Sequence, residues 1–448
     1  MSDEAGGRAA GYFEVLRHNR NFRRLWIGRV ISQTGDWFNS VALFTLLLSL
    51  AGSSESIGYI LILKLLPTFF VGPLAGVVAD RFNRKTIMIV TDLLRGLLAL
   101  GFLLVRTPDQ VWMVYVIVAL EVVLLSFFEP AESAAIPSIV SRDELLSANG
   151  LSGASWSVTL AFGAALGGLV TAAFGRNAAF VVDALSFLAS AAYISAVRFP
   201  PPQPGPGRGE KRLSLADATG VTDFIEGARY LRSNLPVMAL LLVKSGWGLG
   251  GGVLLLLTIF GKQEFPLGRD GSTSIGLLYA SRGFGALIGP VIARWITSGS
   301  PRTMRQSIGA AFFVSAFFYL LVAHSSSLAM AMVFVLGAHM GGSIQWVFST
   351  TLLQMAVPNR FLGRVFALEI ALLTLSMSVS TYLTGYGLDR AGFSVRQMAT
   401  ILGVAFVIPG VAWLLLQRWL DRAEASNAAP APSVIEAEPA AETSFPPT

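Results

Sequence analysis

The chain has 448 residues, of which 53% are hydrophobic and 13% carry a charged side chain. A water-soluble domain has about twice that charged fraction, so this composition excludes a soluble globular protein and predicts a chain largely embedded in a membrane. The formal net charge is +6, which basic loops explain without a nucleic-acid partner. The absence of Cys excludes disulfides and thiolate metal sites, and three scattered His residues form no ligand cluster, so we expect no metal and no cofactor.

The apolar residues gather in stretches of about 20, the length that a helix needs to cross a hydrocarbon core ~30 Å thick. Backbone that lies in lipid must satisfy its own hydrogen bonds, so we expect helices and not open strands. The sequence therefore predicts an all-α membrane protein with twelve transmembrane helices, at residues 24–50, 57–79, 86–105, 111–133, 150–173, 177–197, 236–260, 273–294, 305–323, 327–350, 365–387 and 396–417.

The basic residues predict how the chain lies in the membrane. With the N-terminus inside the cell, roughly 22 of the 33 Lys and Arg residues fall in cytoplasmic segments and about 6 fall outside. We therefore expect a multi-pass protein of the cytoplasmic (inner) membrane with both termini in the cytoplasm. Residues 1–22 contain no apolar core, so we expect no signal peptide there. Phe13, Leu16 and Arg17 suit a short helix on the inner face.

The first predicted helix carries polar side chains at a depth where lipid would reject them. Four of them share one helical face because they are spaced by three or four residues: Arg29, Gln33, Asp36 and Ser40. Asp36 lies roughly 18 Å from the start of the helix, near the bilayer centre. Glu121 lies at a similar depth in the fourth helix. Acids at this depth face a bundle interior or an aqueous cavity and often relay protons, so Asp36 and Glu121 are our candidates for proton coupling.

A structural alternative stays open for these two acids. They would lock helices together if they paired with cations inside the spans, for which the candidates are Lys64, Arg95, Lys244 and Arg282. Asp92 and Arg95 stand three residues apart on one helix, so we expect them to form a structural pair.

A break in the apolar pattern divides the chain into two halves. Residues 198–235 begin with a Pro- and Gly-rich run and continue as an amphipathic stretch, which predicts a flexible cytoplasmic linker followed by an inner-surface helix. The linker separates two six-helix bundles, residues 23–197 and residues 236–418. Residues 419–448 are rich in Ala, Pro and Glu, and we expect them to form a disordered cytoplasmic tail.

The two halves repeat each other at a nearly constant offset. The matched pairs are Gly58 with Gly276, Lys64 with Arg282, and Gly72-Pro73 with Gly289-Pro290. Two parallel repeats around a central site are a transporter architecture. Lys64 and Arg282 would then face one cavity from both halves, and two cations there would suit an anionic or catechol-bearing compound.

Other polar and aromatic residues inside the spans are candidates for the wall of a substrate cavity. Residues 244–252 read Lys-Ser-Gly-Trp-Gly-Leu-Gly-Gly-Gly, and the run of Gly permits either a gating bend or close helix packing. Trp side chains beside polar residues offer stacking surfaces for a bulky ligand, although plain packing is the alternative. The cavity candidates are Gln33, Trp37, Lys64, Lys244, Trp247, Arg282, Gln345 and Trp346.

Three motifs carry a resemblance to a known family. The hairpin after the second helix has the spacing Gly76-x-x-x-Asp80-Arg81-x-x-Arg84-Lys85, which resembles the loop between helices 2 and 3 of the major facilitator superfamily. The segments 127–137 and 353–365 resemble the macrolide-efflux and enterobactin-exporter branch of drug:proton antiporters. The resemblance covers residues 12–418 and implies two pseudo-symmetric six-helix bundles.

The resemblance also implies a cytoplasmic gate. Asp80 would face the N-terminus of helix 11, where the helix dipole favours an anion, and Arg84 would pair with Glu129 or Glu132. The gate residues by resemblance are Gly76, Asp80, Arg81, Arg84, Lys85, Glu129 and Glu132. The alternative is that the hairpin cations only fix topology. Two departures from the branch are the lack of Pro in 163–168, which weakens the antiport assignment, and the acid at Glu132 in place of a basic residue, which would alter the inner gate.

These features predict a secondary active transporter and not an enzyme. The chain has no Gly-x-x-x-x-Gly-Lys-[Ser/Thr] phosphate loop, which argues against an ATP-driven pump. We expect export of a small hydrophobic or amphipathic compound (a drug, siderophore or natural product) by proton antiport and alternating access. The expected partners are this compound, protons and membrane lipid, and the protein would function as a monomer. The alternatives are a facilitator without proton coupling, a lysolipid transporter, and a non-transporting membrane scaffold.

Overall fold

The computed structural model describes residues 11–64, 66–199, 229, 231–296 and 300–428. Every regular element in these ranges is a helix. Most of the predicted linker and its amphipathic helix, together with residues 429–448 of the predicted tail, lie outside the described residues.

The helices form two successive groups along the chain. The first group consists of α1 (Tyr12–His18), α2 (Arg20–Leu50), α3 (Ser54–Leu63), α4 (Leu66–Arg81), α5 (Arg84–Gly101), η1 (Phe102–Leu104), η2 (Pro108–Gln110), α6 (Val111–Ile139), α7 (Arg142–Phe174) and α8 (Arg176–Ser195). The second group consists of α11 (Leu235–Gly248), α12 (Val253–Gln263), η3 (Arg269–Gly271), α13 (Ser272–Ile296), α14 (Pro301–Ala323), α15 (Leu328–Ala356), α16 (Asn359–Asp389), α17 (Val395–Ala405) and α18 (Val407–Ala428).

These helices make the twelve predicted membrane crossings. Ten spans within the described residues are long and apolar enough to cross a membrane. The other two are α2, which is 31 residues long but carries the polar stripe, and the consecutive pair α3 and α4. The all-α fold with two six-helix bundles is therefore confirmed. Helix α18 continues to Ala428, so the residues just after 418 are helical and not disordered as predicted.

Three crossings are interrupted where the sequence predicts single helices. One break follows α3 at Lys64, one lies at residues 249–252 between α11 and α12, and one lies at Phe406. Ser380 of α16 stabilises the second break, since its hydroxyl accepts from the Gly252 amide at 3.1 Å and donates to the Leu249 carbonyl at 2.5 Å. A Cβ on Gly251 would lie 2.7 Å from Met377 Cα, so this run of Gly both bends the helix and allows close packing.

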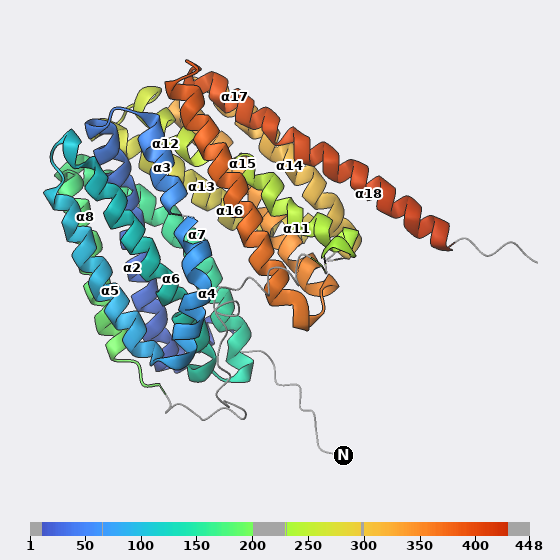
Figure 1. Cartoon of the computed structure of the whole chain (residues 1–448), viewed down its shortest axis with the longest axis horizontal. Coiled ribbons are helices and arrows are strands. Elements are labelled where there is room, and N and C mark those ends of the chain that lie inside the picture. The colour runs from blue at the N-terminus through green and yellow to red at the C-terminus, as the bar shows by residue number, and fades with distance from the viewer. Residues whose placement is uncertain (1–10, 65, 200–228, 230, 297–299, 429–448) are drawn as a thin grey trace, which may run out of the picture.

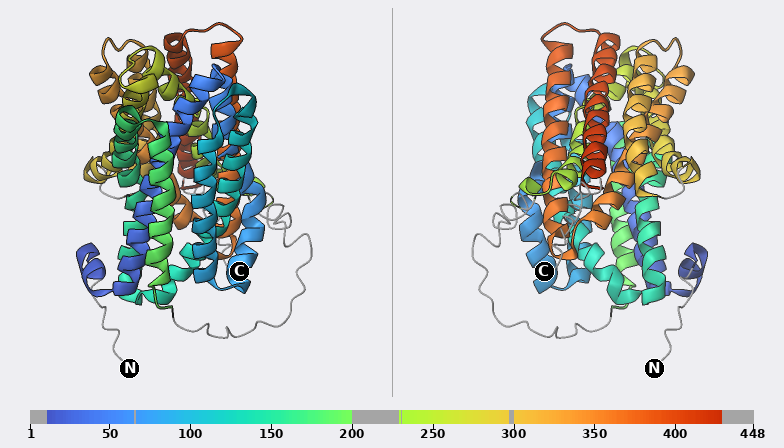
Figure 2. Two further views of the ribbon diagram at one scale, coloured as in Figure 1. Left: turned by 90° about the vertical axis from the view of Figure 1, so that its left-hand side faces the viewer. Right: turned by 90° about the vertical axis from the view of Figure 1, so that its right-hand side faces the viewer.

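The two groups stand side by side as two bundles (Figure 1). We call the end of the molecule that carries α1 and the α4–α5 hairpin the N-terminus side, and the opposite end the far side. Figure 2 shows α1 projecting sideways on the N-terminus side. At the hairpin, Asn83 caps α5, because its side-chain oxygen accepts from the amides of Lys85 and Thr86.

The bundles contact each other along two pairs of crossings. Helix α7 packs on α13, and α3 packs on α16 and α12 near the far side (Figure 1). The first contact is backbone against backbone, because a Cβ on Gly276 would lie 2.4 Å from the Ala164 carbonyl oxygen. Small residues allow membrane helices to approach this closely.

Candidate functional site

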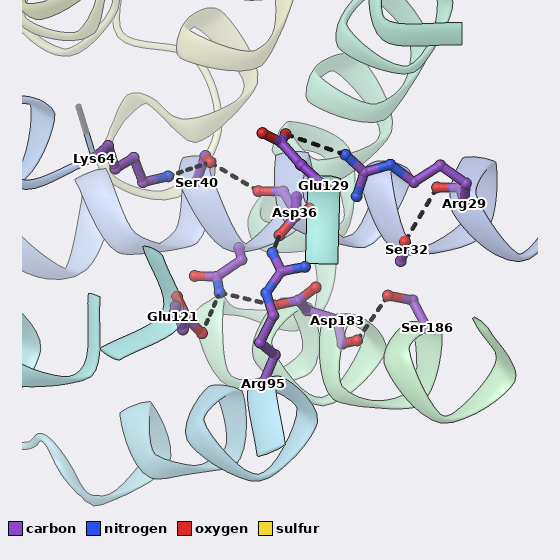
Figure 3. A network of polar contacts seen from close by, with 11 residues as sticks. Arg29, Ser32, Asp36, Ser40, Lys64, Arg95, Glu121, Glu129, Asp183 and Ser186 are labelled. Carbon is purple, nitrogen blue, oxygen red and sulfur yellow. Dashed lines mark hydrogen bonds and ion pairs between the residues drawn. The ribbon is translucent and has the colours of Figure 1, made fainter. Parts of the chain in front are cut away.

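The centre of the N-terminal bundle holds an ion pair whose cation is buried and whose acid is 34% exposed (Figure 3). Nη2 of Arg95, on α5, lies 2.7 Å from Oδ1 of Asp36, on α2. The Arg95 side chain is 3% exposed, and its guanidinium lies 4.3 Å above the centre of the Phe187 ring. The predicted pair of Asp92 with Arg95 is wrong, because the long Arg95 side chain reaches across to the polar face of α2. Both carboxylate oxygens of Asp92 are buried without a hydrogen-bond partner among the described residues.

Two more acids join this centre through a shared amide. Nδ2 of Asn39 donates to Oδ2 of Asp183 at 2.7 Å and, more weakly, to Oε1 of Glu121 at 3.5 Å (Figure 3). Asp183 lies on α8 and is wholly buried. Asp183 and Asn39 are not among the residues predicted from the sequence, although each has a recognisable sequence signal. Asp183 is a single acid in an apolar span, as Glu121 is, and Asn39 stands three residues after Asp36 on the polar face of α2.

Lys64 completes the cluster from the break after α3. Its Nζ donates to the Ser40 hydroxyl at 2.8 Å, and that hydroxyl donates to the Asp36 carbonyl at 2.7 Å. Lys64 also experiences electrostatic attraction from Asp36, Glu121 and Asp183. We call Asp36, Asn39, Lys64, Arg95, Glu121 and Asp183 the polar cluster. Both predicted coupling acids therefore lie in one network, within the N-terminal bundle.

A pocket of about 210 Å³ lies closer to the N-terminus side of the same bundle. Its walls are Arg29, Gln33, Glu129, Glu132, Ser133 and Ser152. Arg29 pairs with Glu132 at 3.3 Å and with Glu129 at 3.5 Å. The resemblance implied that Arg84 pairs with one of these acids, but both contact Arg29 here, and Arg84 Nη1 donates to the Ala134 carbonyl at 2.7 Å.

The structure describes the surroundings of only some of the other residues in the predicted gate. Nζ of Lys85 donates to the carbonyls of Ser195 and Val197, which ties the start of α5 to the end of α8. Gly76, Asp80 and Arg81 belong to α4, but their surroundings lie outside the described part of the chain. The gating role of the hairpin therefore stays a prediction.

The C-terminal bundle holds a second ion pair. Nζ of Lys244, on α11, lies 2.7 Å from Oε2 of Glu369, on α16, and both side chains are buried. Lys244 also lies 4.5 Å from the centre of the Trp346 ring, whose neighbour at 6.4 Å is Trp247. Gln345 is 1% exposed, and neither polar atom of its side chain has a hydrogen-bond partner in the described structure. The structure thus groups four cavity candidates in this bundle.

The remaining cavity candidates meet at the boundary between the bundles. The Arg282 guanidinium, on α13, lies 5.5 Å from the centre of the Trp156 ring, on α7. Trp37 lies 6.4 Å from Trp156 and 6.2 Å from Tyr279. Lys64 and Arg282 thus have different contacts despite their matching positions in the two halves. Among the described residues, no three His, Asp or Glu side chains are placed to hold a metal ion.

The sequence matches the family model of the Major Facilitator Superfamily over residues 25–369. The chain belongs to this superfamily. It is 29% identical to the uncharacterized MFS-type transporter YkuC of Bacillus subtilis, over 62% of this chain and 65% of that one. It is 25% identical to macrolide efflux protein A of Streptococcus pyogenes, over 87% of this chain and 95% of that one. The resemblance to the efflux branch is confirmed.

A solved structure shows the same fold. A bacterial homologue of the human lysosomal transporter Spinster, in an inward-facing and unoccupied conformation, aligns with a TM-score of 0.67 over 90% of this chain and 98% of that one. The sequence identity is 15%, so the likeness concerns the fold alone.

Proposed function

We propose that this transporter exports small amphipathic compounds across the cytoplasmic membrane in exchange for protons. Membership of the superfamily and similarity to a macrolide efflux protein support export. The observation that carries the proton coupling is the charge balance of the polar cluster. Three carboxyl groups, those of Asp36, Glu121 and Asp183, face two cations, Arg95 and Lys64.

The charge balance favours a bound proton. An unpaired carboxylate inside a membrane protein costs several kcal/mol, so one of the three acids is more stable protonated. Asp36 has a cation of its own at ion-pair distance, since Arg95 lies 2.7 Å away. Glu121 and Asp183 share the single amide of Asn39, so they are the pair between which the exchanged proton resides. Of the two acids predicted from sequence, we therefore assign the proton to Glu121 and the fixed charge to Asp36.

Alternating access needs contacts that hold one side of the transporter closed and that break when this side opens. On the far side, Arg390 pairs with Glu55 at 3.2 Å, and the Asp389 carboxylate accepts from the Glu55 amide at 2.7 Å. Lys262 Nζ donates to the Leu48 carbonyl across the same boundary. The bias of Lys and Arg in the sequence supports a cytoplasmic N-terminus side. In that orientation the far-side contacts close the outer face, and the conformation is inward-facing.

An efflux assay tests this function. A thermal-shift screen of hydrophobic drugs on the purified protein first selects a substrate by its rise in Tm. Cells that express the protein are loaded with this compound, and efflux is followed before and after an uncoupler, with ATP held constant. We expect the uncoupler to stop efflux against a gradient. Efflux that continues unchanged would contradict proton coupling and favour a facilitator or a pump.

A further inference from the structure

Arg282 is a buried cation without an acid partner. It lies about 15 Å from the start of α13, near the middle of the membrane, and is 8% exposed. Its Nε is enclosed without a hydrogen-bond partner, and within the described structure no carboxylate lies within ion-pair distance. Its electrostatic neighbours include the hydroxyl-bearing rings of Tyr279 and Tyr319 and the imidazole of His339.

The other cations in the bundle interiors have polar partners. Arg95 pairs with Asp36, and Lys244 pairs with Glu369. Lys64 donates to Ser40 beside three acids. A guanidinium that is buried without an anion is costly, and such a charge inside a membrane marks a functional site by default. The missing partner of Arg282 is therefore a group that the protein itself does not supply.

Aromatic side chains from both bundles surround this cation. Trp156 of the N-terminal bundle lies under the guanidinium and is still 43% exposed. Trp37 stands edge-on to Trp156 and also touches Tyr279 of the C-terminal bundle. A ligand between these rings and Arg282 would contact both bundles. Its binding would then depend on the relative position of the two bundles, as alternating access requires of a substrate.

The pocket on the N-terminus side lies close to this place along two helices. Gln33 and Ser152 line the pocket, and Trp37 and Trp156 stand four residues further along the same two helices. Residues four apart share a helical face and are separated by about 6 Å along the axis. The pocket therefore lies about one helical turn below the aromatic pair.

We propose that Arg282 binds the anionic group of an amphipathic organic anion, whose apolar ring lies against Trp37 and Trp156. This proposal rests on the proposed transport function and names its substrate class. A guanidinium presents a planar fork of donors that matches a carboxylate, sulfonate or phosphate, and its ring neighbours provide stacking area. The depth of Arg282 separates it from the headgroups of the surrounding bilayer, because those remain at the membrane surface.

The test compares two probes of the same size, 2-naphthoate and its uncharged amide 2-naphthamide. Their Kd values are measured by calorimetry on purified protein in detergent micelles. We expect the native protein to favour the anion about tenfold, and Arg282→Gln to reduce this ratio to about one. Arg282→Lys should keep part of the preference. Trp156→Leu should weaken both probes and leave the ratio unchanged.

The matched control is Arg396→Gln. Arg396 also lies over aromatic rings in the C-terminal bundle, but it pairs with Glu264 at 2.7 Å. We expect this variant to keep the anion preference. The Tm without ligand gives a second measurement. Arg282→Gln should not lower it, because the substitution removes an unpaired buried charge.

Two results would overturn the proposal. One is that the native protein binds neither probe, and the other is an anion preference that stays unchanged in Arg282→Gln, whatever the Tm of this variant. Binding in micelles needs no proton gradient. A protein that binds the anion through Arg282 but exports nothing in response to the gradient would refute the proposed coupling and leave this site standing.

Discussion

Arg95 and Asp36 join two helices, α5 and α2, through a contact of 2.7 Å near the middle of the N-terminal bundle. The Arg95 side chain is 3% exposed, and among the described residues Asp36 is the one acid within ion-pair distance of it. The pair therefore contributes to the stability of the bundle and to the electrostatic environment of the neighbouring acids, Glu121 and Asp183.

Removing the Asp36 carboxylate should leave the buried Arg95 guanidinium without an ion-pair partner. We expect Asp36→Asn to destabilise the protein by about 1–3 kcal/mol, since a buried charged group loses its partner. The double variant Asp36→Asn/Arg95→Gln should recover part of this loss. The measurement is the Tm of the native protein, of Asp36→Asn and of the double variant, all in the same detergent. Equal Tm values for native protein and Asp36→Asn would show that the pair contributes little.

The far-side contact of Arg390 with Glu55 should bias the conformation only slightly. Arg390 is 66% exposed, and exposed ion pairs contribute about 0.2–1 kcal/mol. We expect Arg390→Gln to increase opening of the far side by at most about fivefold. The chain has no Cys, so Thr381→Cys gives a unique reporter, and Thr381 of α16 lines the contact with α3 together with Glu55. A labelling rate that does not change in Arg390→Gln would exclude a closing role.

The close packing of α7 on α13 should not tolerate added atoms. A Cβ on Gly276 would lie 2.4 Å from the Ala164 carbonyl oxygen, so Gly276→Ala should force the helices apart and cost about 1–3 kcal/mol. Gly153→Ala, on α7, is the control, because its Cβ would meet nothing within 4 Å. Tm values and transport rates should fall in the first variant alone. Similar losses in both would point to helix flexibility and not to packing.

The hairpin gate predicted from the family resemblance needs its own experiment. If Asp80 closes the cytoplasmic side in the outward-facing state, Asp80→Asn should abolish transport at a normal protein level. A cysteine at Ser133, in the wall of the pocket, should then be labelled faster from the cytoplasm. Normal transport by Asp80→Asn would leave the hairpin a role in topology alone.

The number and order of the membrane crossings could be predicted because apolar length is a property of each segment by itself. The break at Phe406 was not predicted, although Pro409 marks it: Pro has no N–H to donate to the carbonyl of Ala405, four residues earlier, and its ring crowds that carbonyl. The partner of Arg95, in contrast, could not be predicted. A flexible side chain can reach acids on its own helix or on a neighbour, and the choice depends on how the helices pack. Asp183 could have been found, because it carries the same signal as Glu121.

The central claim is that a proton resides between Glu121 and Asp183 and moves against the substrate. The most direct measurement follows the pH inside proteoliposomes with a trapped dye when substrate is added under an imposed pH gradient. We expect substrate to accelerate proton movement in the native protein, and Glu121→Gln and Asp183→Asn to reduce it by at least about tenfold while substrate affinity changes less than about twofold. Substrate-driven proton movement at the native rate in both variants would contradict the claim.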